Sequence, residues 1–136
     1  MLKVVYDTNV VVSAVLKSES IPSSLLALAL QDQVKLCLSP AIFDEYREVL
    51  NRPKFGLQSS AVEHLLREMR AHALLVRPTE PIANPLDEKD SLFLECAVAT
   101  GAQYLVTGNI KHFPASQFRQ TKIVTPSAFA VYFFAS

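Results

Sequence analysis

The chain alternates short apolar runs with segments of helical periodicity, and this alternation limits the folds that are open to it. The runs are rich in β-branched and large apolar residues, which are typical of buried strands. They occupy residues 2–6, 35–38, 74–77, 104–106 and 122–124. Because alternating strands and helices pack as a parallel sheet covered on both faces, we expect a three-layer α/β/α fold with about five strands. A chain of 136 residues has the size of one ordinary domain, so we expect a single domain over residues 1–136.

Cap signals indicate where one long helix begins and where a later one ends. Ser39 followed by Pro40 predicts a helix start, because serine caps free backbone N–H groups and proline suits the first helical position. This helix should run toward Asn51 and end before Pro53. Gly101 should end a later helix, since glycine readily adopts the left-handed conformation at a helix C-terminus.

Two further helices are predicted, one in the middle of the chain and one at its end. Ser60 and Glu63 have the spacing of a capping box, which predicts a helix that reaches about Ala73. Thr125 followed by Pro126 predicts a short terminal helix. Its sequence, AFAVYFFAS, has more large apolar side chains than one short helix face can bury. We expect part of it to contact a second copy of the chain or another protein, and complete packing on the sheet is the alternative.

The overall charge is balanced, but its distribution along the chain is uneven. Lysine and arginine together number 13, as do aspartate and glutamate, so the net charge is zero. This balance argues against binding nucleic acid through one overwhelming basic surface. Acids concentrate in residues 78–95, whereas basic residues predominate in 47–77 and 96–136. An acidic focus between basic segments suits a metal site beside a phosphate-bearing polymer, although solvated helix faces give the same unevenness.

The cysteines and the hydropathy pattern indicate the compartment. Cys37 and Cys96 lie in apolar runs and lack the spacing of a metal site, so we interpret both as buried core thiols. No apolar stretch reaches the roughly 20 residues that cross a bilayer, and the N-terminus has no secretion signal. We therefore expect a cytoplasmic protein without membrane contact.

Asp7 is the first candidate for a functional residue. It ends the apolar run at residues 2–6, where an ion needs a compensating partner. Ligands of open α/β sheets bind beyond the carboxyl ends of the strands, so Asp7 stands where a metal ligand or catalytic group is expected. The alternative is an aspartate that only caps the following helix.

Glu45 is the second candidate, because helical geometry separates it from its acidic neighbours. At about 100° per residue, the apolar residues of the helix after Pro40 form one stripe. Asp44 and Glu48 lie nearly opposite this stripe, while Glu45 lies on its edge and can face inward. The alternative is a boundary glutamate whose stem covers apolar surface while its head stays in water.

Asp90 and Asn109 complete the set of candidate oxygen ligands. Asp90 begins a helix that is apolar almost all round, where the helix dipole also favours a carboxylate, and Asp87 could be the cap. Thr107 and Asn109 follow the predicted strand at 104–106, although Asn109 could equally belong to a turn. Each assignment is ambiguous alone, but capping does not require all of these oxygens to converge.

With these residues identified, the chain resembles the PIN-domain family, specifically the bacterial VapC-like toxin components of toxin-antitoxin systems. The resemblance covers nearly the whole chain. It rests on three segments: VVYDTNVVVSAVL, SPAIFDEYREVLNRPKF and DEKDSLFLECAVATGAQYLVTGNIKHFP. Together these segments match the opening strand with its aspartate, the helix with the second acid, and the helix-borne aspartate followed by a Thr-Gly segment.

The resemblance implies a set of metal ligands and one departure from the family pattern. It implies that Asp7, Glu45 and Asp90 are the catalytic residues and main metal ligands, with Asp87 and Asn109 in support. Many PIN domains have aspartate after Thr-Gly, where this chain has asparagine. The substitution removes one negative charge, so a second metal ion should bind weakly or only together with substrate.

The implied chemistry is hydrolysis of phosphodiester bonds with Mg²⁺ or Mn²⁺ as the cofactor. Both ions prefer carboxylate and water oxygens and lower the pKa of a bound water. Thr8, Asn9 and Thr107 could support the site, and Lys111 or Arg47 could contact the scissile strand. His112 follows Asn109 and could touch a phosphate, but it is interpreted as mainly structural. The resemblance further implies RNA as substrate, an antitoxin protein as partner and a homodimer or higher oligomer.

Three functions compete on the sequence. The leading one is a metal-dependent endoribonuclease that acts on single-stranded RNA as a toxin. The second is a catalytically weak PIN module that binds RNA or a protein without cutting, which Asn109 and the zero net charge favour. The third is a phosphoacceptor domain that uses Asp7. It fits poorly, because such a domain needs a paired acid beside its first strand and a lysine after its last, and KIVTP does not offer this layout.

Overall fold

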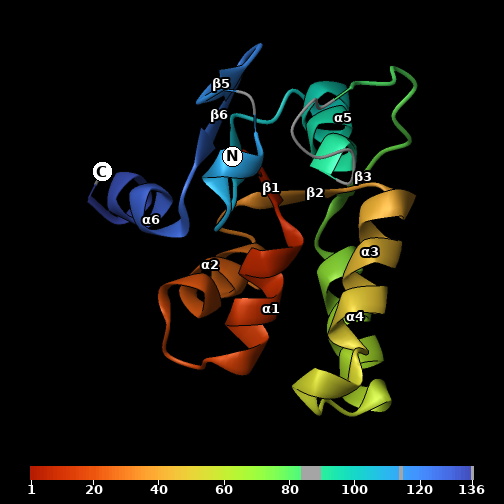
Figure 1. The fold of residues 1–136 in the computed structure, drawn as a ribbon. Coiled ribbons are helices and arrows are strands. Elements are labelled where there is room, and N and C mark those ends of the chain that lie inside the picture. The colour runs from red at the N-terminus through yellow and green to blue at the C-terminus, as the bar shows by residue number, and fades with distance from the viewer. Residues whose placement is uncertain (84–89, 114, 136) are drawn as a thin grey trace.

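The computed structural model describes residues 1–83, 90–113 and 115–135, which form a central sheet with helices on both sides (Figure 1). The elements in chain order are β1 (Lys3–Tyr6), α1 (Thr8–Leu16), α2 (Ile21–Leu30), β2 (Lys35–Leu38), α3 (Pro40–Leu50), η1 (Pro53–Phe55), α4 (Ser59–Ala71), β3 (Leu74–Leu75), α5 (Ser91–Thr100), β4 (Tyr104–Val106), η3 (Ile110–His112), β5 (Gln117–Phe118), β6 (Thr121–Val124) and α6 (Pro126–Ala135). The predicted α/β class is confirmed.

The sheet has the strand order β3-β2-β1-β4-β6-β5 over the described residues. Strands β3, β2, β1, β4 and β6 are parallel, and the two-residue strand β5 pairs antiparallel with β6 at one edge. The prediction of about five strands is therefore confirmed for the parallel part of the sheet. It missed β5, because a two-residue strand is too short to have a recognisable pattern. The run predicted at 74–77 forms a strand only over Leu74–Leu75.

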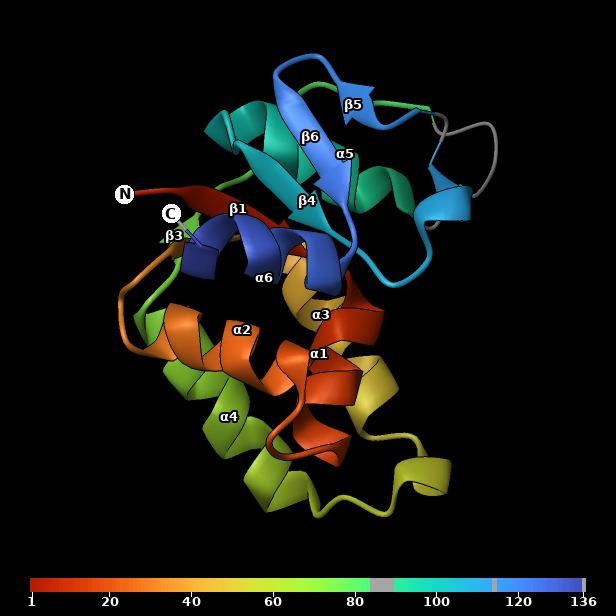
Figure 2. The same ribbon diagram turned by 90° about the vertical axis from the view of Figure 1, so that its left-hand side faces the viewer.

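Strand β1 lies at the centre of the core. Val4, Val5 and Tyr6 are fully buried, and Val5 pairs in register with Leu105 of β4. Helix α5 packs against β1, β2 and β4 on one side of the sheet, while α1 to α4 gather on the other (Figure 1). Helix α6 lies next to α2 (Figure 2). The central position of β1 brings its carboxyl end between those of β2 and β4.

The helix boundaries agree with most of the cap signals. The Ser39 hydroxyl accepts a hydrogen bond from the backbone N–H of Ile42, 3.2 Å away, at the start of α3. Thr125 accepts a bond from the N–H of Ala128 at the start of α6. Gly101 ends α5 with a φ of 68°, which is the left-handed conformation that glycine adopts most easily.

The capping box predicted for α4 is wrong. The helix begins at Ser59, and Gln58 precedes it without a side-chain cap. Glu63 does not reach back to the helix start, because its carboxylate pairs with Arg47 of α3 at 2.9 Å. A tertiary ion pair thus uses the residue that the local spacing assigned to a cap. The helix also ends at Ala71 rather than near Ala73.

Both cysteines lie in the core, and the helices are short. Cys37 and Cys96 are free and buried, as predicted. Among the described residues, no single helix is long and apolar enough to cross a membrane. Helices α1 and α2, which meet at 103°, reach that length and composition only as a bent pair.

The contrast between Ser39 and Ser60 yields a stability prediction. Ser39→Ala should lower the free energy of unfolding by about 1 kcal/mol, because it removes the cap of α3 at a buried position. Ser60→Ala should change it by less than about 0.5 kcal/mol, because Ser60 is exposed and caps nothing. Urea unfolding of both variants checks this prediction. An equal loss of unfolding free energy in the two variants would support the capping box at Ser60.

Candidate metal and catalytic site

Asp7 and Thr107 meet because they follow two neighbouring strands. Asp7 comes directly after β1 and Thr107 directly after β4, and the backbone N–H of Asp7 donates to the carbonyl of Val106 at 2.9 Å. The Thr107 hydroxyl donates to Asp7 Oδ2 at 2.7 Å, and the Thr8 N–H donates to Asp7 Oδ1 at 2.7 Å. Asp7 is only 4% exposed and Thr107 is fully buried. Asp7 therefore caps α1 and is also a buried carboxylate at the carboxyl end of β1. We call the group of polar side chains around it the carboxylate site.

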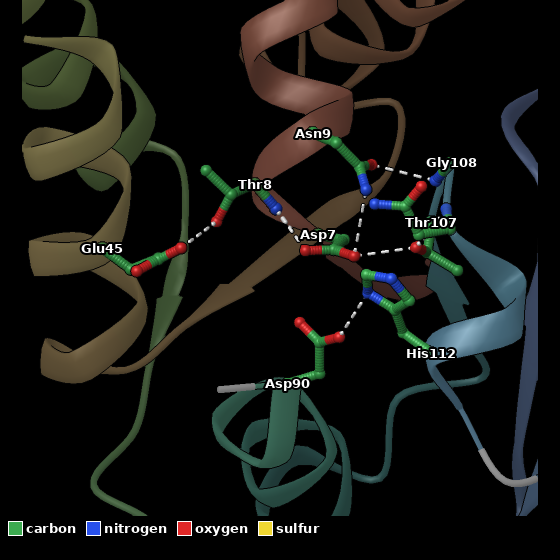
Figure 3. A network of polar contacts seen from close by, with 9 residues as sticks. Asp7, Thr8, Asn9, Glu45, Asp90, Thr107, Gly108 and His112 are labelled. Atoms are coloured by element: carbon green, nitrogen blue, oxygen red, sulfur yellow. Dashed lines mark hydrogen bonds and ion pairs between the residues drawn. The ribbon is translucent and has the colours of Figure 1, made fainter. Parts of the chain in front are cut away.

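Asn9 connects Asp7 to the loop that follows β4 (Figure 3). Its amide nitrogen donates to Asp7 Oδ2 at 3.3 Å, and its amide oxygen accepts from the Gly108 N–H at 2.9 Å. A Cβ atom on residue 108 would lie 3.2 Å from that oxygen, so a side chain there would crowd the amide. The role of Gly108 could not be found from the sequence, because only the fold brings it to Asn9.

Glu45 approaches the same site from helix α3. Its Oε2 accepts a hydrogen bond from the Thr8 hydroxyl at 3.2 Å, and the side chain is half-buried. Asp44 and Glu48 point away, toward Arg47 at 3.6 Å and Arg52 at 2.9 Å. The predicted direction of the three acids on this helix is confirmed.

Tyr46 holds α3 against the end of β1. It is fully buried, and its hydroxyl donates to the backbone carbonyl of Tyr6, the residue before Asp7. Because Tyr46 adjoins Glu45 in the sequence, the same bond fixes the distance between α3 and Asp7. Sequence reasoning treated Tyr46 only as part of an apolar stripe and missed this function.

Asp90 lies at the start of α5 and faces the same site (Figure 3). It is 8% exposed and makes no capping hydrogen bond to its own helix, so capping does not account for its burial. Its Oδ2 lies 3.1 Å from Nδ1 of His112 in η3. His112, which the sequence analysis considered mainly structural, is thus in contact with a candidate ligand. Asp87 lies outside the described residues.

The remaining predicted residues lie at the edge of this group or outside it. Asn109 and Lys111 are exposed, and the Asn109 N–H donates to the Thr107 hydroxyl at 2.9 Å. Arg47 does not join the carboxylates. It pairs with Glu63, and its guanidinium lies 4.8 Å from the ring centre of Phe43. The helical position of Arg47 directs it toward α4, and its contact with the scissile strand stays a prediction.

Burial raises the pKa of Asp7 above its ordinary value, since the ionised carboxylate loses hydration. The hydrogen bonds from Thr107 and Thr8 oppose this rise, and so does the nearby His112. The charge of Glu45 adds to it. Asp7 is thus a carboxylate whose ionised form lacks enough compensation from the protein, which is the condition that a bound cation relieves.

The donor atoms suit a hard divalent cation. Asp7, Glu45 and Asp90 offer carboxylate oxygens from three different elements, and Mg²⁺ and Mn²⁺ prefer such oxygens. Within residues 1–83, 90–113 and 115–135, no three Asp, Glu, His or Cys side chains lie close enough to hold an ion by themselves. Mg²⁺ commonly keeps several waters and needs only one or two carboxylates, so this spacing fits a partly hydrated ion.

Comparisons with known proteins identify a family and a matching fold. The sequence model of the PIN domain matches residues 3–111. The uncharacterized protein MJ1680 of Methanocaldococcus jannaschii is 27% identical over 111 residues, which cover 79% of this chain and 71% of that protein. A crystal structure of VapBC2 from Rickettsia felis, bound to a DNA fragment from its promoter, superposes with a TM-score of 0.61. The match has 15% identity and covers 91% of this chain and 98% of the other, so it bears on the fold alone.

The raised pKa of Asp7 gives a pH prediction for the metal-free protein. A carboxylate whose folded pKa exceeds its unfolded value stabilises the fold only while protonated, so its contribution is lost as pH rises through the folded pKa. Asp7→Asn removes this loss and keeps one oxygen acceptor. In EDTA, the Tm of Asp7→Asn minus the Tm of the natural protein should increase as pH rises from 4 to 7.

The same measurement with Mn²⁺ provides the control. Mn²⁺ should raise the Tm of the natural protein and of Asp44→Asn, which changes an exposed carboxylate, but should not raise that of Asp7→Asn. Two results would contradict the assignment of Asp7 as a metal ligand. One is a Tm difference between Asp7→Asn and the natural protein that decreases as pH rises, and the other is an equal response of all three proteins to Mn²⁺.

Proposed function

Because the chain belongs to the PIN domain family, we propose that it is a metal-dependent endoribonuclease that hydrolyses phosphodiester bonds in single-stranded RNA. The observation that carries the proposal is the convergence of Asp7, Glu45 and Asp90 on one site from β1, α3 and α5. Capping accounts for part of the role of Asp7 but for neither of the others. We further propose that the chain acts in the cytoplasm as one domain.

In this proposal Asp7, Glu45 and Asp90 hold Mg²⁺ or Mn²⁺, and Asn109 supports them from the rim. The ion would lower the pKa of a bound water and neutralise charge on the phosphate. The protein's own contribution is to hold the oxygens in place. Thr107 and Thr8 orient the Asp7 carboxylate through hydrogen bonds of 2.7 Å each.

We propose that the chain is the toxin of a toxin-antitoxin pair and binds a cognate antitoxin protein. The proposal draws support from the fold shared with the chain of the Rickettsia felis VapBC2 structure. An antitoxin that covers the carboxylates would keep the nuclease inactive until it is removed. Copurification with the product of the neighbouring reading frame tests this, and a chain that is never captured by that product argues against the pair.

A catalytically weak PIN module that binds RNA or a protein is the second candidate. It is favoured by Asn109, which supplies an amide where many relatives have a carboxylate, and by the absence of a complete three-ligand group in the described part of the chain. The two candidates differ in one observable. The enzyme cleaves RNA when Mn²⁺ is added, whereas the module binds RNA under the same conditions and leaves it intact.

Glu45 and Glu48 test the enzyme proposal on one helix. Glu45→Gln should lower Mn²⁺-dependent RNA cleavage by about 100-fold, because it removes a carboxylate that faces Asp7 through Thr8. Glu48→Gln should have little effect, because Glu48 is exposed and pairs only with Arg52. Calorimetric titration of Mn²⁺ into both variants measures the matching change in metal affinity. Equal losses of cleavage and Mn²⁺ affinity in the two variants would show that the direction of the glutamate side chain on α3 does not matter.

Helix α6 carries an apolar surface that fits a second copy of the chain. Phe129 is fully buried, and Phe133 is half-buried with its ring centre 6.0 Å from that of Phe129. Val131, Tyr132 and Phe134 are 69%, 44% and 58% exposed. The helix has no charged residue, so two copies can pack face to face without repulsion. We propose a homodimer that uses this face of α6.

The exposed residues of α6 provide the test of the dimer. The double change Val131→Ser and Phe134→Ser should yield a folded monomer, since both side chains are exposed and removing them leaves the core intact. Leu16→Ser, which changes an exposed leucine on α1, is the control and should leave the oligomer unchanged. Light scattering measures the mass, and an unchanged mass of the double variant excludes α6 as the interface.

A further inference from the structure

A groove with three arginines lies beside the carboxylate site. It encloses about 710 Å³ between α3, α4 and the edge strand β3. Its lining includes Ser39, Phe43, Arg47, Arg70, Leu75 and Arg77. A smaller cavity of about 250 Å³ shares Ser39 and Arg77 with it and adds Ala41 of α3 and Leu92 of α5. The two cavities therefore adjoin and form one path, which we call the arginine groove.

The arginine groove runs along the same edge of the sheet as the carboxylates. Strands β3, β2 and β1 are parallel neighbours, so their carboxyl ends lie side by side. Arg77, Ser39 and Asp7 follow these ends directly or within two residues. At its near end, Ala41 lies one helical turn before Glu45, and Leu92 lies two residues after Asp90. The groove thus begins beside the carboxylates and leads away from them.

Two of the three arginines have their charge available. Arg47 is paired with Glu63 at 2.9 Å and Asp44 at 3.6 Å. Arg70 and Arg77 are exposed, and no carboxylate pairs with either among the described residues. The groove therefore presents an excess of positive charge at these two positions.

The acids in the lining do not cancel this charge. Asp44 is committed to Arg47, and Glu95 in the smaller cavity accepts a hydrogen bond from the N–H of Ile82 at 3.0 Å. Two guanidinium groups lie close to the Phe43 ring, those of Arg47 at 4.8 Å and Arg70 at 5.3 Å from its centre. Aromatic rings and guanidinium planes are the surfaces on which the bases of single-stranded RNA stack.

We propose that the arginine groove holds the RNA strand on one side of the cleaved bond, with Arg70 and Arg77 contacting its phosphates and the Phe43 cluster contacting a base. The inference rests on the proposed function, because it takes the carboxylates as the point of cleavage. An acidic protein segment would also meet the arginines, but it has no use for the aromatic ring and guanidinium planes that bases stack on. A polymer cut at that point must leave along its neighbouring surface.

Binding measured without metal tests the groove separately from cleavage. A fluorescent 12-nucleotide single-stranded RNA is titrated with protein in EDTA at several salt concentrations. Arg70→Ala and Arg77→Ala should each weaken binding at least about threefold and reduce the slope of log affinity against log salt by about 0.7. Arg67→Ala, on the same helix as Arg70 but outside the groove lining, is the charge-matched control and should do neither.

The possible outcomes distinguish a failure of the arginine-groove proposal from a failure of the nuclease proposal. Arginine-dependent binding by a protein that never cleaves RNA with Mn²⁺ supports the groove and contradicts the nuclease. Cleavage together with unchanged affinity and salt slope in both arginine variants overturns the groove alone. Poly-glutamate serves as a second probe. If its binding falls in the variants while RNA binding does not, the groove is a protein surface and the proposal is wrong.

Discussion

The burial of one carboxylate is the constraint on which this structure depends. Asp7 stands at the end of the central strand with 4% of its surface exposed, and its charge loses most of its hydration there. Thr8, Asn9 and Thr107 supply the hydrogen bonds that hold it. They come from the start of α1 and from the end of β4, so the same bonds that stabilise the carboxylate also join two segments of the fold.

Helix α3 is placed against this centre by a second buried contact. The Tyr46 hydroxyl donates to the carbonyl of Tyr6, the last residue of β1. The bond orients the whole helix, so Glu45 faces Asp7 on one side while Arg47 faces α4 and the arginine groove on another. One helix thereby serves both the carboxylate site and the surface that we propose for the RNA strand.

Local patterns predicted the features that depend on neighbouring residues only. The cap at Ser39, the end of α5 at Gly101 and the inward direction of Glu45 all follow from backbone geometry within a few residues. The capping box at Ser60 failed for the opposite reason. Glu63 had a distant partner in Arg47, and an ion pair between two helices cannot be recognised from spacing along one of them.

The sequence by itself determined the α/β class, the order of the five parallel strands along the chain, and the residue types that could form an oxygen-rich site at strand ends. The tertiary structure alone decided which of these residues meet. His112 reaches Asp90 and Gly108 reaches Asn9 across 22 and 99 residues of chain. The physical reason is that hydrophobic periodicity encodes which face of each element is buried, whereas contacts between loops depend on how all the elements pack together.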